Sequence, residues 1–139
     1  MPRYQSDAPT TVVETWGLRP GWRVWVGGHN VEAKQEIERH LAGVEHPPTG
    51  PIDLGLIAPQ TADEALYFAG KLCHRLAAGG IVWIAYPNPR FAGNAGLASQ
   101  FDELTVGMFE RGFGEAGGGA LNDQYSMIGF RFQGRPDEP

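Results

Sequence analysis

The chain has 139 residues, a length that suits one domain with a core of its own. Hydrophobic residues make up 42% and charged residues 19%, which is typical of a folded domain and excludes a disordered chain. The net charge is -5 and the basic residues are spread singly, so we expect no nucleic-acid partner. No apolar stretch reaches the ~20 residues that cross a bilayer, so we expect a soluble, cytoplasmic protein with no membrane partner.

Both ends of the chain are polar. Residues 1–9 are predicted to form a flexible arm and residues 133–139 a flexible tail, with a single domain between them. A short helical turn is expected at Thr10–Trp16, followed by a turn at Leu18–Gly21. The first strand is then predicted at Trp22–Val26, where β-favouring residues alternate.

A helix is predicted at Val31–Ala42. Asn30 before it is a suitable N-cap, because its side chain can accept a hydrogen bond from a free backbone N–H of the first turn. Apolar residues recur at every fourth position and would form one buried face: Ala33, Ile37 and Leu41.

The middle of the chain carries the clearest helix start. Ile52–Ala58 is mostly apolar, as expected of a strand that is buried on both faces. Thr61 with Glu64 three residues later forms a capping-box pattern. The apolar stripe of the helix that follows continues to Ala77, so we expect it to end at Gly79–Gly80.

Four elements are predicted in the last third of the chain. Ile81–Tyr86 reads as another buried strand, and Ser99 is a possible cap for a helix over Gln100–Arg111. A short strand around Ala120–Leu121 then leads through a tight turn into a strand at Tyr125–Phe132. Because a hairpin joins these two strands, the last one should run antiparallel to the rest.

This order predicts an α/β fold of three layers. We expect a Rossmann-like, mostly parallel sheet with helices on both faces and an antiparallel C-terminal hairpin. Three stretches carry a family resemblance: "GLRPGWRVWVGG", "LAAGGIVWIAYPNPR" and "LNDQYSMIGFRF". They resemble a small family, with no assigned reaction, that is similar to the C-terminal half of class I S-adenosylmethionine-dependent methyltransferases. The resemblance covers Leu18–Phe132 and implies a single, truncated methyltransferase-like domain.

The sequence departs from the methyltransferase pattern where the methyl donor would bind. The resemblance implies an acidic residue and a three-glycine loop after the first strand, and a second acidic residue that holds the ribose. Here only Gly27 and Gly28 follow the strand, with no carboxylate before them, and the second region holds Pro47–Pro48. We therefore expect no cofactor: the glycine pair is a weak candidate for cofactor binding, and S-adenosylmethionine stays an alternative.

Ligands of open α/β sheets bind at the carboxyl ends of the parallel strands. Six polar or aromatic residues are predicted to share that rim as ligand-binding candidates: His29, Gln60, Tyr86, Asn88, Arg90 and Asp123. His29 is the candidate catalytic residue, as a general base or a lone metal ligand. The spacing of the histidines favours no metal site.

Three functions remain open, and the sequence leaves open whether the chain is an enzyme. The first is a degenerate methyltransferase-like domain that does not methylate and acts through self-association or a protein partner. A homodimer is expected, because Trp22–Val26 would lie at an unpaired edge of the sheet. The second is a small enzyme or small-ligand binder that uses the rim. The third is an S-adenosylmethionine-dependent methyltransferase.

Overall fold

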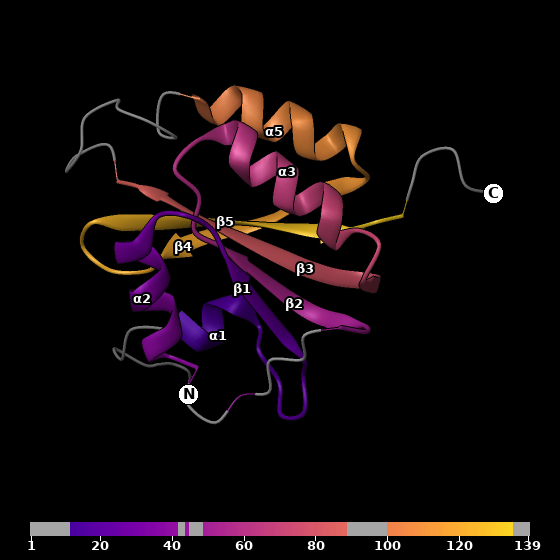
Figure 1. The fold of residues 1–139 in the computed structure, drawn as a ribbon, viewed down its shortest axis with the longest axis horizontal. Coiled ribbons are helices and arrows are strands. Elements are labelled where there is room, and N and C mark those ends of the chain that lie inside the picture. Colours follow the sequence, from indigo (N-terminus) through magenta and orange to yellow (C-terminus); the bar gives the residue numbers. More distant parts are fainter. Residues whose placement is uncertain (1–11, 42–43, 45–48, 89–99, 135–139) are drawn as a thin grey trace, which may run out of the picture.

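The computed structural model describes residues 12–41, 44, 49–88 and 100–134, which form a five-stranded sheet between helices (Figure 1). The predicted arm and most of the predicted tail lie outside the described residues. In chain order the elements are α1 (Val12–Trp16), β1 (Val24–Gly27), α2 (Val31–Arg39), β2 (Ile52–Ile57), α3 (Ala62–Leu72), β3 (Leu76–Pro87), α5 (Phe101–Glu110), β4 (Phe113–Ala120) and β5 (Tyr125–Phe132).

The sheet has the order β1-β2-β3-β5-β4. Strands β1, β2 and β3 pair in parallel, whereas β5 is antiparallel to both of its neighbours, β3 and β4. Helices α3 and α5 lie on one face of this sheet, and α1 and α2 lie on the other (Figure 1). The predicted three-layer fold with a mostly parallel sheet and an antiparallel C-terminal hairpin is therefore confirmed.

Each face of the sheet has its own apolar core. Leu104 and Met108 of α5 are fully buried in the core beneath α3 and α5. Trp16 is fully buried on the opposite face, where its indole N–H points at the sulfur of Met127, 2.9 Å away. The indole N–H of Trp83 donates to the carbonyl of Trp16 at 3.2 Å, which ties α1 to the centre of the sheet.

Local signals at the helix starts are confirmed. The Asn30 side chain accepts from the backbone N–H of Ala33 at 3.2 Å, and Thr61 Oγ1 accepts from the backbone N–H of Glu64 at the same distance. Helix α2 is shorter than predicted, since it ends at Arg39. The predicted cap Ser99 lies outside the described residues.

Two strand boundaries were predicted wrongly. Leu76 was placed at the end of a helix, but it begins β3, because the carbonyl of Arg75 accepts a long-range bond from the backbone N–H of Ile52. Strand β4 was expected around Ala120–Leu121, but it begins at Phe113, because its backbone pairs with β5 along its whole length. In both cases strand pairing overrides the local preference of the segment.

Strand β1 is at an edge of the described sheet, as predicted. The side chains of this strand pack on the faces of the sheet, since Val24 has no exposed surface and Trp25 and Val26 are half-buried. No helix within the described ranges has the length and apolar character needed to span a membrane.

Candidate functional site

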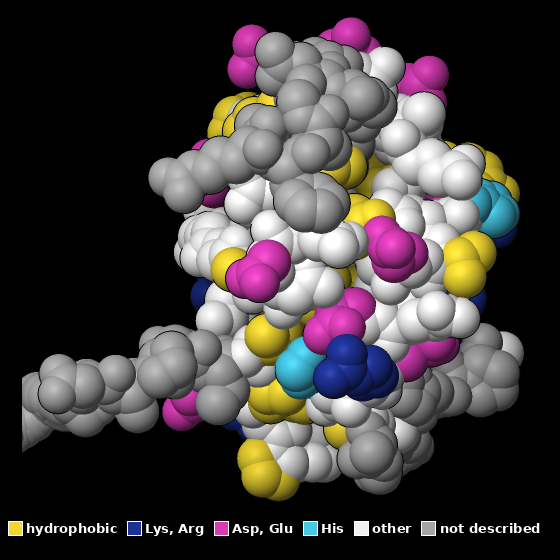
Figure 2. Space-filling model, turned by 90° about the vertical axis from the view of Figure 1, so that its left-hand side faces the viewer, with side chains coloured by type: hydrophobic (Ala, Val, Ile, Leu, Met, Phe, Trp, Pro, Cys, Tyr) yellow, Lys and Arg dark blue, Asp and Glu magenta, His cyan; other side chains and the backbone are white. Residues whose placement is uncertain are grey.

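The carboxyl ends of the parallel strands meet on the left-hand side of the molecule in Figure 1, and Figure 2 looks onto this rim. Acidic side chains are scattered over the whole of this face (Figure 2). Five of the six rim candidates predicted from the sequence are described: His29, Gln60, Tyr86, Asn88 and Asp123. The sixth, Arg90, lies outside the described residues.

A glutamate from α3 occupies the part of the rim between β1 and β2. Oε2 of Glu64 accepts a hydrogen bond from the backbone N–H of His29 at 2.6 Å, and it lies 2.7 Å from Nδ1 of the His29 ring. Oε1 of Glu64 accepts from the backbone N–H of Gln60 at 2.8 Å. The Glu64 side chain is only 13% exposed, whereas that of His29 is 74% exposed. One carboxylate therefore takes up the backbone donors that follow two neighbouring strands.

The sequence places Glu64 there through the start of α3. Thr61 caps the helix, and its neighbour Gln60 lies three positions after Ile57, the last residue of β2. In a full capping box the carboxylate would return to the backbone N–H of Thr61. The carboxylate instead accepts from the backbone N–H groups of Gln60 and His29. The bond from Glu64 N–H to the Thr61 side chain is therefore confirmed, and the predicted return bond is wrong.

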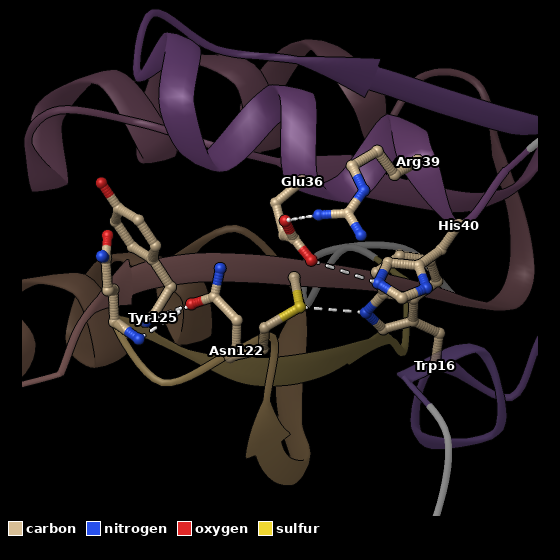
Figure 3. Close-up of polar contacts among 8 residues, drawn as sticks. Trp16, Glu36, Arg39, His40, Asn122 and Tyr125 are labelled. Carbon is tan, nitrogen blue, oxygen red and sulfur yellow. Dashed lines mark hydrogen bonds and ion pairs between the residues drawn. The ribbon is translucent and has the colours of Figure 1, made fainter.

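The opposite part of the rim is held by the hairpin turn. Asn122 Oδ1 accepts from the backbone N–H groups of Gln124 and Tyr125, each at 2.9 Å, so the turn is an Asx turn (Figure 3). The backbone N–H of Asn88 donates to the carbonyl of Gln124 at 2.8 Å, which fixes the end of β3 to this turn. Asp123 projects from it and is exposed.

Tyr125 connects the hairpin to the start of α2. Its hydroxyl donates to Oε1 of Glu32 at 2.8 Å and lies 3.4 Å from Oδ1 of Asn30. Burial raises the pKa of Tyr125; the bond to Asn30 lowers it, and the nearby Glu32 carboxylate raises it further. The phenol therefore stays neutral and serves as a hydrogen-bond donor between two elements.

Tyr86 contributes an aromatic surface to the rim. Its half-buried ring contacts the ring of Phe101 with centroids 5.4 Å apart, where β3 meets the start of α5. Gln100, just before α5, accepts from the backbone N–H of Ala62 through its side-chain oxygen at 2.9 Å. The N-terminal ends of α3 and α5 are thus joined beside the rim.

Packing within the chain explains both glycines at the end of β1. A Cβ at Gly27 would meet the indole of Trp25, which lies flat along its own strand. Gly28 has a φ of 123°, and a Cβ there would lie 2.1 Å from the carbonyl oxygen of Ala58. That carbonyl accepts from the backbone N–H of Asn30, and the backbone N–H of Ala58 donates to Gly27. The glycine pair therefore lets the backbones following β1 and β2 approach each other.

A separate polar cluster lies at the end of α2. Oε1 of Glu36 accepts from Arg39 at 2.6 Å, and Oε2 of Glu36 lies 3.5 Å from Nε2 of His40 (Figure 3). That distance suits an ion pair, but the buried Nε2 has no hydrogen-bond partner among the described residues. The His40 ring meets the indole of Trp16 edge-on, so the cluster belongs to the packing of α2 on α1. Within the described ranges, no three His, Cys, Asp or Glu residues are placed to share a metal ion.

Sequence reasoning missed three of the residues that organise the rim: Glu32, Glu64 and Tyr125. The position of Glu64 in the first turn of α3 signals that it can reach a preceding backbone N–H, which accounts for Gln60. The contact of Glu64 with His29 and that of Tyr125 with Glu32 join residues 35 and 93 positions apart. No local pattern predicts such contacts.

The sequence matches no protein-family model and no curated protein. Solved structures do resemble it. A SAM dependent methyltransferase from Aquifex aeolicus is 10% identical with a TM-score of 0.57, and the match covers 87% of each chain. TnmH is 15% identical with a TM-score of 0.53, and the match covers 88% of this chain and 45% of TnmH.

The pyocyanin biosynthetic protein PhzM gives a similar result, with 15% identity, a TM-score of 0.50, and a match over 87% of this chain and 45% of PhzM. The chain thus spans less than half the length of TnmH and PhzM, but most of the Aquifex aeolicus protein. At such low identities the likeness concerns the fold alone. The chain has a methyltransferase-like Rossmann fold.

Proposed function

We propose that this chain is a degenerate methyltransferase-like domain that does not methylate and acts by association with a second copy of itself. The observation that carries the proposal is the position of the Glu64 carboxylate. It accepts the backbone N–H groups of His29 and Gln60, the donors that follow β1 and β2. A ligand that approached these strand ends would have to displace a bound carboxylate.

The residues at the end of β1 do not fit S-adenosylmethionine. The Cβ direction of Gly28 points at the carbonyl of Ala58, and that of Gly27 points at the indole of Trp25, so both glycines pack against atoms of the chain itself. In the described sheet no strand lies beyond β1, so the position of the ribose-binding acid is not supplied there. We infer that no methyl donor binds to the chain.

A surface suited to association lies beside β1, on the α3 side of the sheet. We call it the β1 aromatic patch and define it as Trp25, His29, Tyr67 and Phe68. The Phe68 ring is 5.3 Å from the ring of Trp25, 5.4 Å from that of Tyr67 and 6.2 Å from that of His29. Tyr67 is 59% exposed. Tryptophan and tyrosine are enriched at the centres of protein interfaces because they bury much apolar area.

The charged groups beside this patch contact its aromatic side chains. Glu64 binds His29, and the ammonium of Lys71 lies 5.2 Å from the ring centre of Tyr67. A two-fold interface brings the same surface of both copies together, so unpaired like charges would oppose it. The β1 aromatic patch has none of its own, which favours a second copy as its partner.

Sedimentation equilibrium tests the association. The wild-type chain is expected to form a dimer, and Tyr67→Asp is expected to be a monomer, since it places an unpaired charge in the apolar interface. Phe109→Asp is the matched control, because Phe109 is an aromatic residue on α5, away from the patch, with an exposure of 51% against 59% for Tyr67. A monomeric wild type, or a Tyr67→Asp variant that dimerises as well as Phe109→Asp, contradicts the proposal.

A second candidate function is a small enzyme or ligand binder that uses the rim. The contact of Glu64 with Nδ1 of the exposed His29 ring favours it, because a carboxylate in this position orients an imidazole for general-base catalysis. A thermal-shift screen with nucleotides, divalent metals and small acids tests this function. A ligand whose stabilisation is lost in His29→Ala but kept in Glu38→Ala would support the rim as a site.

A further inference from the structure

The outer surface of α3 and α5 carries an apolar strip inside an acidic border. The two helices lie side by side on one face of the sheet, with α5 outermost (Figure 1). Between them is a hollow of about 530 Å³, here called the α3–α5 groove. It is lined by Leu66, Asp102, Glu103, Val106, Gly107, Glu110 and Arg111.

The floor of the groove is apolar because Gly107 lets the two helices approach closely. A Cβ at Gly107 would lie 2.6 Å from the end of the Leu66 side chain, so Leu66 fills the space a larger residue would need. Val106 beside it is 57% exposed, and Phe109, one turn further along α5, is 51% exposed. Residues three apart on a helix are neighbours on its surface, so these two form one strip.

The border of the groove is negatively charged. Asp102, Glu103 and Glu110 are all exposed, and none of them takes part in an ion pair with another described residue. The cation of the groove, Arg111, is engaged as a cap, since its guanidinium donates to the carbonyl of Gly107 at 2.9 Å. The lining of the groove thus holds three carboxylates and one guanidinium, so its net charge is negative.

We propose that the α3–α5 groove binds a cationic amphipathic helix of a partner protein. Apolar side chains of that helix pack on Leu66, Val106 and Phe109, and its lysines or arginines face the acidic border. A helix suits the groove because two parallel ridges accept a third helix as in other helix-in-groove complexes. Helix α5 has 10 residues, so the contact extends over two to three turns of the partner.

The charge of the border argues against other occupants. A two-fold contact with a second copy would bring the acidic borders of both copies together, and like charges repel. A nucleic acid and an anionic lipid surface carry the same sign as the border and are disfavoured for the same reason. A cationic amphipathic segment has an apolar face that can pack on the strip, and it has positive charges that complement the acidic border.

Fluorescence anisotropy tests the proposal with a labelled helical peptide of leucine, alanine and lysine as the probe. Two control peptides accompany it: one with the same composition reordered so that no apolar face forms, and one with glutamate in place of lysine. We expect saturable binding of the first peptide, at least about tenfold weaker binding of the reordered one, and no binding of the acidic one. Equal affinity for the reordered peptide overturns the proposal.

Variants of the chain locate the binding. Val106→Ser is expected to weaken the peptide about tenfold, and so is Glu103→Lys. The matched controls are Val31→Ser, at a 62% exposed valine on α2, and Glu38→Lys, at an exposed glutamate on α2; both should bind as the wild type does. The proposal is also overturned if the α2 variants weaken binding as much as the α5 variants. Because Tyr67→Asp should bind the peptide normally, this result is independent of dimerisation through the β1 aromatic patch.

Discussion

The carboxylate of Glu64 lies 2.6 Å from the backbone nitrogen of His29 and 2.7 Å from Nδ1 of its ring. These residues come from the first turn of α3 and from the loop after β1, so the contact joins two neighbouring strand ends across the rim. A largely buried carboxylate with backbone donors on both oxygens is part of the folded structure. Because the contact belongs to the folded structure, its loss should first be measurable as a change in the free energy of unfolding.

Replacing Glu64 should destabilise the fold. In Glu64→Gln only one oxygen remains to accept, and the new NH2 group faces a backbone N–H, so a donor is left without a partner. We expect a loss of about 1–3 kcal/mol in the free energy of unfolding, measured by urea denaturation. Glu38→Gln, at an exposed position on α2, should stay within about 0.5 kcal/mol of the wild type. If both variants are equally stable, the carboxylate does not hold the strand ends.

A side chain at Gly28 should be more costly than one at another glycine of similar backbone conformation. Gly28 has a φ of 123° and Gly21 a φ of 83°, but a Cβ at Gly21 would meet nothing within 4 Å. Gly21→Ala is expected to cost about 1–2 kcal/mol from the left-handed backbone alone. Gly28→Ala also forces a clash with the carbonyl of Ala58, so about 3 kcal/mol or more is expected in chemical denaturation.

Comparing the two alanine variants separates the cost of the backbone conformation from the cost of the clash with the Ala58 carbonyl. If Gly28→Ala costs no more than Gly21→Ala, the backbones after β1 and β2 are not in the close approach described above. The glycine pair would then be available to a ligand, which would favour a cofactor loop.

The Arg23–Asp53 pair should make stability depend on pH in the acidic range. Burial raises the pKa of Asp53, but hydrogen bonds from the backbone N–H and the guanidinium of Arg23, together with its charge, hold that pKa below the ordinary value of 3.8. A carboxyl whose pKa is lowered by folding contributes stability that is complete above the unfolded-state pKa. That contribution is lost as the pH falls through the folded-state pKa.

The free energy of unfolding of the wild type should therefore exceed that of Asp53→Asn at neutral pH, and the difference should shrink as the pH is lowered below about 4. Urea denaturation between pH 7 and acidic pH, in steps, gives both curves. Glu115→Gln, at an exposed position on β4, should follow the wild type throughout. A constant difference between the wild type and Asp53→Asn would mean that Asp53 is not stabilised by Arg23.

The sequence predicts those features of the fold that depend on nearby residues. The caps Asn30 and Thr61 act within three positions of themselves, so a local pattern is sufficient to recognise them. Buried strands such as β2 are recognisable because they are mostly apolar and do not alternate. The antiparallel direction of β5 follows from its hairpin connection alone.

Features that depend on distant residues were not predictable in this way. Leu76 continues an apolar helical stripe, and only its pairing with Ile52 makes it the start of a strand. Phe109 is a large apolar residue of α5, yet it is 51% exposed because no described element packs over it. At the rim, the residues that follow each strand are predictable from the sequence. The Glu64 carboxylate that binds His29 and Gln60 is not, because it comes from a helix.

The central claim is that the strand ends are occupied by the chain itself and do not hold a methyl donor. Isothermal titration calorimetry of the wild-type chain with S-adenosylmethionine tests it most directly, and S-adenosylhomocysteine serves as a second ligand. We expect no saturable binding of either compound. A dissociation constant in the low micromolar range for S-adenosylmethionine would contradict it, since that affinity requires an open site for the methyl donor.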